Sequence, residues 1–529
     1  MTTPRSEWLP ETDVPLVEGT VGGLLVEQAK HHPDVVALIG TSHAGEDRRW
    51  TYAELLDAAR HAAGSLLTVA DPGDHVALWA PNVAEWPIVQ YAAALAGVTL
   101  VALNPALRPA ELEYCLRLSQ ASVLVHADRA RTYDMAAVVA EVAPTIPDRL
   151  EVISLSDAGR LHGSPVQPEE LSSPESPAMI QFTSGTTGHP KAVLLSHRSL
   201  VNNARLTMLT AEVEPGAVAI APLPSFHTAG CVISHLGPAV LGGTMVLIST
   251  FDPSAVLRAM TEHGASVLFG VPTVLAAVLQ AARASSNPVP QLATVLVGAS
   301  TVPGSMIEAV EQTFGASVHN LYGQTELSPV MCLTRRSDTR EDLVTSVGRP
   351  LPHTGARIVD PVTGAVQPLG VAGEVCARGY NQMISYFDDP EATAATVDAE
   401  GWLHTGDLGS MDARGLITLS GRLKELIIRG GENISPAEIE IALAAHPAVA
   451  ESAVVGLPDE TWGEIVAAVV TTHGPAAPDL ERQLTEHCLS RLTPFKVPVR
   501  WFFRDELPHT ASGKVQKFVL RDELTARSS

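Results

Sequence analysis

The sequence predicts an α/β protein with a large N-terminal domain of several subdomains, rich in parallel sheet, and a small α+β domain after it. Short apolar runs alternate with amphipathic helical stretches along most of the chain, as in parallel sheets covered by helices. The length of 529 residues exceeds what one core organises, since domains span roughly 100–200 residues. Hydrophobic residues make up 46% of the chain, beside 40 Gly and 39 Pro, which is typical of a folded protein rich in loops.

The alternation can be followed element by element. An apolar run at His75–Ala80, helical spacing at Glu85–Ala96 and a second apolar run at Thr99–Leu103 form a strand–helix–strand unit. The same patterns predict strands at Ser122–His126, Ala178–Phe182, Val218–Pro222, Met245–Ile248, Ser266–Phe269 and Thr294–Gly298, and helices at Ser254–His263 and Pro303–Phe314.

A domain boundary is predicted near Leu419–Lys424. After a turn-rich region the helical pattern restarts, with Ser435 as an N-cap and Pro436 at the first helical position. About a hundred residues remain, which is enough for one small domain. We therefore predict an N-terminal domain over residues 1–420 and a C-terminal domain over residues 421–529.

The acidic composition limits the partners of the chain. Its formal net charge is −23, whereas nucleic acids and anionic membranes attract basic surfaces. The longest apolar region, Val232–Ile248, is interrupted by Gly237-Pro238, which favours a buried core over a membrane span. We expect no nucleic-acid partner and no integral membrane association, and an anionic ligand must bind where cations are concentrated locally.

The cysteines and the N-terminus favour a cytoplasmic location. The five cysteines are scattered without a CxxC pair, so we predict reduced thiols and neither a disulfide framework nor a zinc site. No apolar core of a signal peptide follows the first charged residues. The sequence is silent on the oligomeric state.

The segment Gln181–Lys191 reads Gln-Phe-Thr-Ser-Gly-Thr-Thr-Gly-His-Pro-Lys. Its residues Thr183–Gly188 combine four hydroxyl side chains with two glycines, which suits close approach and hydrogen bonding to an anion. A Walker loop needs glycine before the lysine and Ser/Thr after it, where this chain has Pro190 and Ala192. We predict a phosphate-holding loop of another class; the segment alone leaves a solvated turn open.

Further motifs follow in a fixed order, at Val297–Ser300, Asn320–Glu326, Gly401–Leu408, Gly421–Ile428, Gly430–Pro436 and Thr510–Lys514. Together with the phosphate loop they resemble the adenylate-forming superfamily of acyl-CoA synthetases, stand-alone adenylation enzymes and luciferases. The resemblance covers nearly the whole chain and is closest to the medium-chain acyl-CoA synthetase branch, through Ile427–Ile434 and Ser512–Phe518.

The resemblance implies that ATP activates a carboxylic acid. Lys514 would bridge the carboxylate and the α-phosphate, where preorganised cations stabilise the added negative charge. Tyr322 would stack on adenine, and Asp407, partnered by Arg422, would accept from the ribose. The residues alone leave a turn lysine, a core aromatic and a turn-closing aspartate open. The other implied ATP-binding residues are Thr183, Ser184, Gly185, Thr186, Thr187, Gly188, Lys191, Gly298, Ala299, Ser300, Gly323 and Thr325.

The resemblance also implies a metal site and a moving domain. Glu326 would hold Mg²⁺ with the Thr183 hydroxyl, since hard oxygen donors suit magnesium on phosphates. Lys424 matches the hinge about which the small, mobile C-terminal domain would rotate between the two half-reactions. Gly430 and Gly431 would then line the tunnel for the pantetheine of CoA, because a side chain would narrow it. A β-turn glycine pair is the alternative.

The segment Pro224–Gly230 lies where the family builds its acyl pocket. Amino-acid-adenylating relatives place an aspartate after the phenylalanine, but this chain has His227 there. A buried ammonium without a carboxylate would be unfavourable, so α-amino acids are disfavoured. His227 is expected to gate or flank the carboxylate site, with a structural histidine as the alternative. The remaining pocket candidates are small or apolar and suit an uncharged aliphatic or aryl tail: Gly230, Cys231, Val271, Val330 and Met331.

The predicted activity is that of an acyl-CoA synthetase. A carboxylic acid, expected to be a medium-chain fatty acid, and Mg·ATP give acyl-AMP and pyrophosphate, and CoA then gives the thioester and AMP. The competing hypotheses are an aryl-acid CoA ligase, a stand-alone enzyme that loads a carrier protein, and a non-catalytic nucleotide-binding sensor.

Overall fold

The computed structural model describes residues 4–146, 150–166, 171–183, 190–298, 302–429, 432–459, 461–475, 478–510 and 514–528. The chain divides into two compact units. The larger unit comprises Trp8–Ala356 and Ala377–Leu403; the smaller comprises Met1–Glu7, Arg357–Cys376 and His404–Ser529. The predicted domain boundary at residue 420 stays a prediction.

The first sheet of the larger unit has seven strands in the order β21-β11-β10-β5-β4-β6-β9. The strands β10, β5, β4, β6 and β9 run parallel, while β11 and β21 add an antiparallel edge. The central strands are buried along their length, which explains their continuous apolar runs. The bounds are β4 His75–Trp79, β5 Thr99–Leu103, β6 Val123–His126, β9 Glu151–Ser154, β10 Pro177–Thr183, β11 Lys191–Ser196 and β21 Ser385–Tyr386.

The second sheet has nine strands in the order β18-β17-β16-β15-β14-β12-β13-β2-β3. The six strands from β16 to β2 are parallel, and antiparallel strands close both edges. The bounds are β2 Val36–Thr41, β3 Asp47–Thr51, β12 Val218–Ala221, β13 Thr244–Leu247, β14 Val267–Gly270, β15 Thr294–Gly298, β16 Ser317–Gly323, β17 Val330–Leu333 and β18 Arg349–Pro350.

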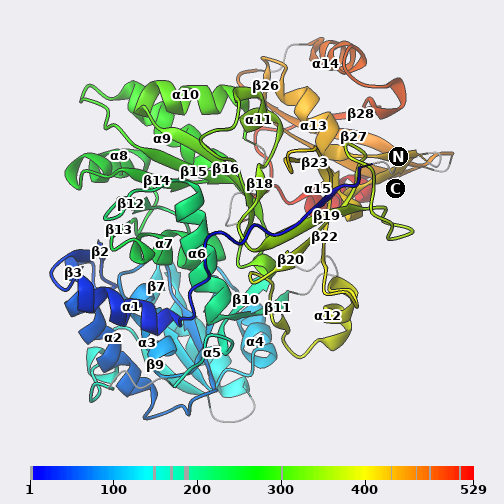
Figure 1. Cartoon of the computed structure of the whole chain (residues 1–529). Helices are drawn as coiled ribbons and strands as arrows, with labels where there is room; N and C mark the ends of the chain where they lie inside the picture. Colours follow the sequence, from blue (N-terminus) through cyan, green and yellow to red (C-terminus); the bar gives the residue numbers. More distant parts are fainter. Residues whose placement is uncertain are drawn as a thin grey trace. The chain divides into compact units, whose positions relative to one another are not determined.

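Helices cover these sheets in distinct groups. Helices α8, α9 and α10 line one side of the nine-stranded sheet and share a core with it (Figure 1). Helix α6 contacts β11 of one sheet and β17 of the other, so one hydrophobic core continues between the sheets. The helices of the larger unit are α1 Val21–His31, α2 Tyr52–Leu66, α3 Glu85–Leu95, α4 Pro109–Leu118, α5 Met135–Val142, α6 His197–Thr210, α7 His235–Val240, α8 Pro253–Glu262, α9 Pro272–Ala284, α10 Gly304–Phe314, α11 Arg340–Thr345 and α12 Pro390–Thr396.

The predicted α/β class and its parallel sheets are confirmed, and the predicted strands and helices lie within two residues of the observed ones. The apolar region Val232–Ile248 folds into a π-helix (Ala229–Ser234), α7 and β13, all largely buried in the core. Among the described residues, none of the helices has the length and apolar character to cross a membrane. All five cysteines are free and buried.

The smaller unit contains most of a five-stranded sheet, β1-β19-β20-β22-β23, and a second sheet, β25-β24-β27-β26, in which β28 pairs with β27. Helices α13 and α14 share one core with the second sheet and α15 shares another. The bounds are β1 Glu7–Trp8, β19 Thr354–Val359, β20 Gly373–Gly379, β22 Leu403–Met411, β23 Ile417–Arg422, β24 Ile427–Arg429, β25 Glu432–Ile434, β26 Val449–Asp459, β27 Gly463–Thr472, β28 Arg500–Phe503, α13 Pro436–Ala444, α14 Leu480–Leu489 and α15 Lys517–Ser528.

Helix α13 begins as predicted, with Ser435 at the N-cap position and Pro436 first in the helix. The Ser435 hydroxyl does not cap the helix, however, but donates to the carbonyl of Ser420. The side chain therefore fastens the start of the helix to strand β23.

Candidate active site

The carboxyl ends of four neighbouring parallel strands bring predicted site residues to one edge of the nine-stranded sheet. Strands β12, β14, β15 and β16 lie side by side in register. Strand β12 leads into Pro224–Gly230, and β14 leads into Val271. Gly298 is the last residue of β15, and Tyr322 lies near the end of β16. Ligands of open α/β sheets bind outside the carboxyl ends of the strands, so this edge is where a nucleotide or acyl group is expected.

The predicted phosphate loop is the connection of an antiparallel hairpin. Strands β10 and β11 pair so that Thr183 lies opposite Lys191, at the two ends of the loop. Residues Ser184 to Gly188 lie outside the described residues. The Lys191 ammonium lies 4.4 Å from the ring centroid of Tyr386, which is a cation–π contact. The hairpin thus delivers one hydroxyl and one cation to the same end of the strand pair.

Glu326, the predicted metal ligand, lies in a short 3-10 helix (Thr325–Leu327) after β16 and is partly buried. Its Oε1 accepts a hydrogen bond of 2.7 Å from the Tyr386 hydroxyl. Burial first, and the Glu326 carboxylate second, raise the pKa of Tyr386, so its hydroxyl stays protonated and donates. Tyr386 was not predicted, because no motif singles it out and only the pairing of β21 with β11 brings it close to Glu326.

The loop that carries Glu326 is fixed on both sides. A Cβ at Gly323 would lie 1.9 Å from the carbonyl oxygen of Pro329, so only glycine fits. From helix α6, Asn203 donates to the carbonyl of Val330 at 2.7 Å and accepts from its N–H at 3.0 Å. Asn203 was also not predicted, since nothing in its helix marks it as a contact of a loop 127 residues away.

Gly298 has a packing reason for its missing side chain. A Cβ there would lie 2.4 Å from the carbonyl oxygen of Leu321 on the neighbouring strand. Sheet packing therefore demands glycine at this position with or without a nucleotide. Ala299 and Ser300, which follow it, lie outside the described residues.

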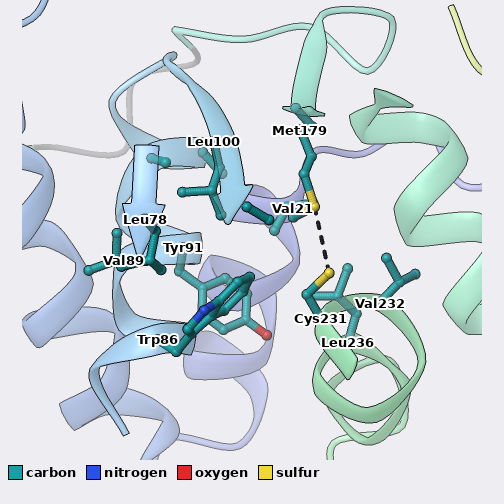
Figure 2. Close-up of a cluster of buried hydrophobic side chains, with 14 of the residues drawn as sticks. Val21, Leu78, Trp86, Val89, Tyr91, Leu100, Met179, Cys231, Val232 and Leu236 are labelled. Atoms are coloured by element: carbon teal, nitrogen blue, oxygen red, sulfur yellow. Dashed lines mark hydrogen bonds between the residues drawn. The ribbon is translucent and has the colours of Figure 1, made fainter. Parts of the chain in front are cut away.

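The acyl-pocket candidates divide into buried and partly exposed residues. Cys231 is fully buried among core side chains and its thiol donates to the Met179 sulfur at 3.6 Å (Figure 2). Gln181 donates to the Cys231 sulfur at 3.2 Å, and burial raises the pKa of the thiol. Gly230, Val330 and Met331 are also buried, whereas His227 and Val271 are partly exposed.

His227 begins the turn into the π-helix. Its Nδ1 accepts from the N–H of Ala229 at 3.3 Å, so in the neutral ring the proton sits on Nε2. That tautomer makes Nε2 a donor, which suits contact with a carboxylate oxygen.

Asp407 and Arg422, predicted as partners, lie opposite each other on β22 and β23 of the smaller unit. Their Oδ1 and Nε atoms are 2.8 Å apart, and the Asp407 side chain is 7% exposed against 53% for Arg422. The carboxylate is therefore held in place by a guanidinium that reaches solvent, and the ion pair leaves no net charge.

The turn before Asp407 is closed by other groups. Gly406 has a left-handed φ of 71°, and its N–H donates to Glu374 Oε1 at 3.0 Å. The Thr405 hydroxyl accepts from the Asp407 N–H at 3.1 Å, and Glu374 Oε2 pairs with His404 Nδ1 at 2.7 Å. Glu374 and Thr405 therefore take part in closing this turn, beside the ion pair of Asp407 with Arg422. Glu374 was not predicted.

Glu374, Cys376 and His404 offer ligand atoms that all lie within 4.8 Å of one another, and such a group could hold a metal ion. Both oxygens of the Glu374 carboxylate, however, already take part in the hydrogen bonds of the turn. We therefore interpret the hydrogen bonds of Glu374 to His404 and Gly406 as structural: they hold the segment that carries Asp407.

Lys514 is exposed, and its backbone bonds to Thr510. Its N–H donates to the Thr510 hydroxyl at 3.1 Å, and the Thr510 N–H donates to the Lys514 carbonyl at 2.7 Å. Lys424 belongs to a 3-10 helix (Leu423–Glu425) whose Glu425 carboxylate lies 3.1 Å from Lys517, the first residue of α15. The side chain of Lys424 and the whole of Gly430 and Gly431 lie outside the described residues.

Comparison with known sequences decides the family. The profile of AMP-binding enzymes matches residues 25–387, and that of the AMP-binding enzyme C-terminal domain matches residues 438–514. The chain belongs to the AMP-binding enzyme family. The predicted membership of the adenylate-forming superfamily is thereby confirmed.

Relatives within this family are CoA ligases by name. YngI of Bacillus subtilis, assigned provisionally to the acyl-CoA synthetases, is 35% identical and the match covers 96% of this chain and 97% of YngI. The mitochondrial medium-chain acyl-CoA ligase ACSF2 of Rattus norvegicus is 34% identical over 97% of this chain and 89% of its own. The o-succinylbenzoate CoA synthetase MenE of Bacillus subtilis, solved with its acyl-adenylate, has a TM-score of 0.82 at 30% identity, covering 96% and 98% of the two chains.

Proposed function

We propose that the protein is an AMP-forming acyl-CoA synthetase for a carboxylic acid with an uncharged tail. In the first half-reaction a carboxylate oxygen bonds to the α-phosphorus of ATP and the bond to the β-phosphate oxygen breaks, giving acyl-AMP and pyrophosphate. In the second, the CoA sulfur bonds to the acyl carbon, AMP leaves with the former carboxylate oxygen, and the thiol proton passes to solvent. The observation that carries the proposal is the family match along the chain, in which Lys191, Glu326, Asp407, Arg422 and Lys514 are all present.

The described residues divide the binding of ATP among them. Lys191 and the hydroxyls of the hairpin would hold the β- and γ-phosphates, and Tyr322 would stack on adenine. Asp407 would accept from a ribose hydroxyl, because Arg422 holds its carboxylate in place. Lys514 would stabilise the negative charge that develops between the acid and the α-phosphate.

Magnesium fits Glu326 on chemical grounds. A neutral hydroxyl occupies one carboxylate oxygen and leaves the negative charge in place, which is the donor that a hard cation needs. Glu326 and Thr183 would hold the ion. When bound, Mg²⁺ supplies charge neutralisation for the phosphates.

The C-terminal domain, residues 421–529, would serve both half-reactions by turning about Lys424. Gly430 and Gly431 would line the path of the pantetheine. We propose that the enzyme works in the cytoplasm.

A medium-chain fatty acid is the favoured substrate. The ACSF2 relative is named for medium-chain acids, and the pocket candidates Cys231, Val271, Val330 and Met331 carry no charge. An aryl acid is the second candidate, favoured by the similarity to MenE.

Acid-dependent exchange of pyrophosphate into ATP tests the first half-reaction, and CoA-dependent release of AMP tests the second. A panel of fatty and aryl acids should give both activities, with the highest kcat/KM for medium-chain acids. Lys514→Ala should abolish exchange while thioester formation from pre-made acyl-AMP persists. The matched control Lys30→Ala, an exposed lysine of α1, should keep both.

Two outcomes would contradict the proposal. Absence of exchange with every acid would favour a nucleotide-binding sensor. Transfer to the pantetheine of a carrier protein but not to free CoA would identify a stand-alone adenylation enzyme.

A further inference from the structure

One short segment, Met383–Phe387, is fastened to both functional elements of the larger unit. Its strand β21 pairs with β11, the strand that Lys191 begins. Ile384 N–H donates to the carbonyl of Leu194 at 2.8 Å and Phe387 N–H to that of Ala192 at 2.7 Å. At the other end, Met383 N–H donates to the carbonyl of Glu326 at 2.8 Å. The backbone of the segment thus ties the carboxylate-bearing loop to the lysine-bearing strand.

The side chain of Tyr386 makes the same connection between the functional groups themselves. Its hydroxyl donates to Glu326 Oε1 at 2.7 Å, and its ring centroid lies 4.4 Å from the Lys191 ammonium. Tyr386 is 6% exposed, so its ring has a fixed position.

A tyrosine is chemically suited to hold the Glu326 carboxylate and the Lys191 ammonium without neutralising either charge. A hydroxyl that donates to Glu326 leaves the carboxylate negative, whereas a guanidinium or ammonium partner would neutralise it. The ring face attracts the Lys191 ammonium through its quadrupole and leaves the N–H groups of Lys191 able to donate. Contacts of this kind restrict the orientation of the Glu326 carboxylate and the Lys191 ammonium, and both groups keep their charge for a ligand.

We propose that Tyr386 is a positioning residue of the adenylation half-reaction, which orients the Glu326 carboxylate for the metal of Mg·ATP and the Lys191 ammonium for its terminal phosphates. The inference rests on the function proposed above. Tyr386 does not touch the reacting atoms and acts through the two residues that it holds.

The test separates the hydroxyl from the ring. Tyr386→Phe removes the hydroxyl, which bonds to Glu326 and also to Thr396, and Tyr386→Leu removes the ring beneath Lys191 as well. The matched control is Tyr133→Phe, because the Tyr133 hydroxyl also donates a 2.8 Å hydrogen bond, to Leu107, and its ring also carries a cation, Arg108 at 4.9 Å.

Two measurements are made on the full-length protein: the Mg²⁺ dependence of pyrophosphate exchange, and binding of Mn²⁺ to the protein–ATP complex without acid, followed by electron paramagnetic resonance. Tyr386→Phe should raise the half-saturating Mg²⁺ and Mn²⁺ concentrations about tenfold, as loss of an outer-shell partner does, with an unchanged KM for the acid. Tyr386→Leu should in addition raise the KM for ATP. Tyr133→Phe should leave all these values as in the wild type.

An unchanged Tm would show that Tyr386→Phe is folded. If this folded variant then has the metal dependence of the wild type, the proposal is overturned and Tyr386 is only a core aromatic. A double-mutant cycle with Glu326→Gln adds a readout that general destabilisation does not move: the effect of Tyr386→Phe on Mn²⁺ binding should vanish in the Glu326→Gln background. If none of the tested acids supports pyrophosphate exchange by the wild type, the proposed function fails. Mn²⁺ binding to the protein–ATP complex then still decides the role of Tyr386.

Discussion

Two carboxylates predicted to serve ATP, Glu326 in the larger unit and Asp407 in the smaller, are held by different kinds of partner. Glu326 accepts from the neutral Tyr386 hydroxyl at 2.7 Å, whereas Asp407 is paired with the Arg422 guanidinium at 2.8 Å. The distances are nearly equal, but the first contact leaves a negative charge and the second cancels it.

This difference assigns the two groups different tasks. A carboxylate that keeps its charge is suited to a divalent cation, as proposed for Glu326. A carboxylate neutralised by arginine still accepts hydrogen bonds and is suited to a sugar hydroxyl, as proposed for Asp407. Residue type alone does not distinguish the two, because the partner of each group decides its net charge.

The largest expected effect is that of Glu326→Gln. Glutamine keeps an acceptor for Tyr386 but removes the charge, so kcat for pyrophosphate exchange should fall by about 10²–10³, the scale of removing one preorganised electrostatic contact. Initial rates at saturating ATP and Mg²⁺ measure the effect. The control Glu262→Gln, at the exposed end of α8, should behave as wild type, and a Glu326→Gln enzyme with normal kcat would end the distinction between the two carboxylates.

Asp407→Asn should act on binding more than on rate. The change removes a charged acceptor, and such hydrogen bonds contribute about 1.5–3 kcal/mol, so the KM for ATP should rise about 10–100-fold with a smaller change in kcat. Steady-state kinetics at varied ATP measure the split. Arg422→Gln should reproduce the effect in weaker form, and an unchanged KM in Asp407→Asn would contradict the ribose assignment.

Glu374→Gln should have a smaller effect through the turn that presents Asp407. The change removes the charged acceptor that bonds to Gly406 and His404. The KM for ATP should therefore rise about 2–10-fold, the scale of one net hydrogen bond. Cys376→Ala removes the 3.5 Å contact of its thiol with His404 but keeps the hydrogen bonds of Glu374, and should keep the wild-type KM. An equal effect of the two substitutions, together with bound metal found by elemental analysis of the purified protein, would identify the group as a metal site.

The last expected effect concerns stability rather than catalysis, and it involves His235, which lies outside both carboxylate sites. His235 bonds to Ser225 and Gln90 at 3.1 Å each, and burial lowers its pKa from 6.5 to about 3. Below pH 6.5 the unfolded chain therefore binds a proton that the folded chain refuses, so stability is complete above that pH and falls towards pH 3, by at most about 1.4 kcal/mol per pH unit from this residue.

Thermal melting between pH 7 and pH 5 checks this sign. Tm of the wild type should fall with pH, and His235→Gln should show a shallower slope. The exposed His31→Gln should keep the wild-type slope. Equal slopes for the wild type and His235→Gln would contradict the neutral buried state of His235.

Local patterns were sufficient to predict much of the fold and part of the candidate site. The strand at Thr99–Leu103 is found with the predicted bounds, because a buried parallel strand needs a continuous apolar run. Thr183 and Lys191 were predicted as the ends of a loop and are found opposite each other in a hairpin. The pairing of Asp407 with Arg422, implied by the family resemblance, is observed on adjacent strands.

Other contacts of the site had no signal in the sequence. The hydrogen bond from Tyr386 to Glu326 joins residues 60 positions apart, and that from Val330 to Asn203 joins residues 127 apart. The cap predicted at Ser435 occupies its position, but its hydroxyl bonds to Ser420 because strand β23 lies within reach. In each case a distant segment supplies the partner.

The sequence by itself therefore determined the α/β alternation, the order of the motifs and the chemical types available to them, since these depend on neighbours a few residues apart. Only the tertiary structure decided that Glu326 accepts a hydrogen bond from a neutral tyrosine hydroxyl, whereas Asp407 forms an ion pair with an arginine. The physical reason is that the electrostatic character of a side chain depends on the group placed against it, and sheet pairing, not sequence proximity, places that group.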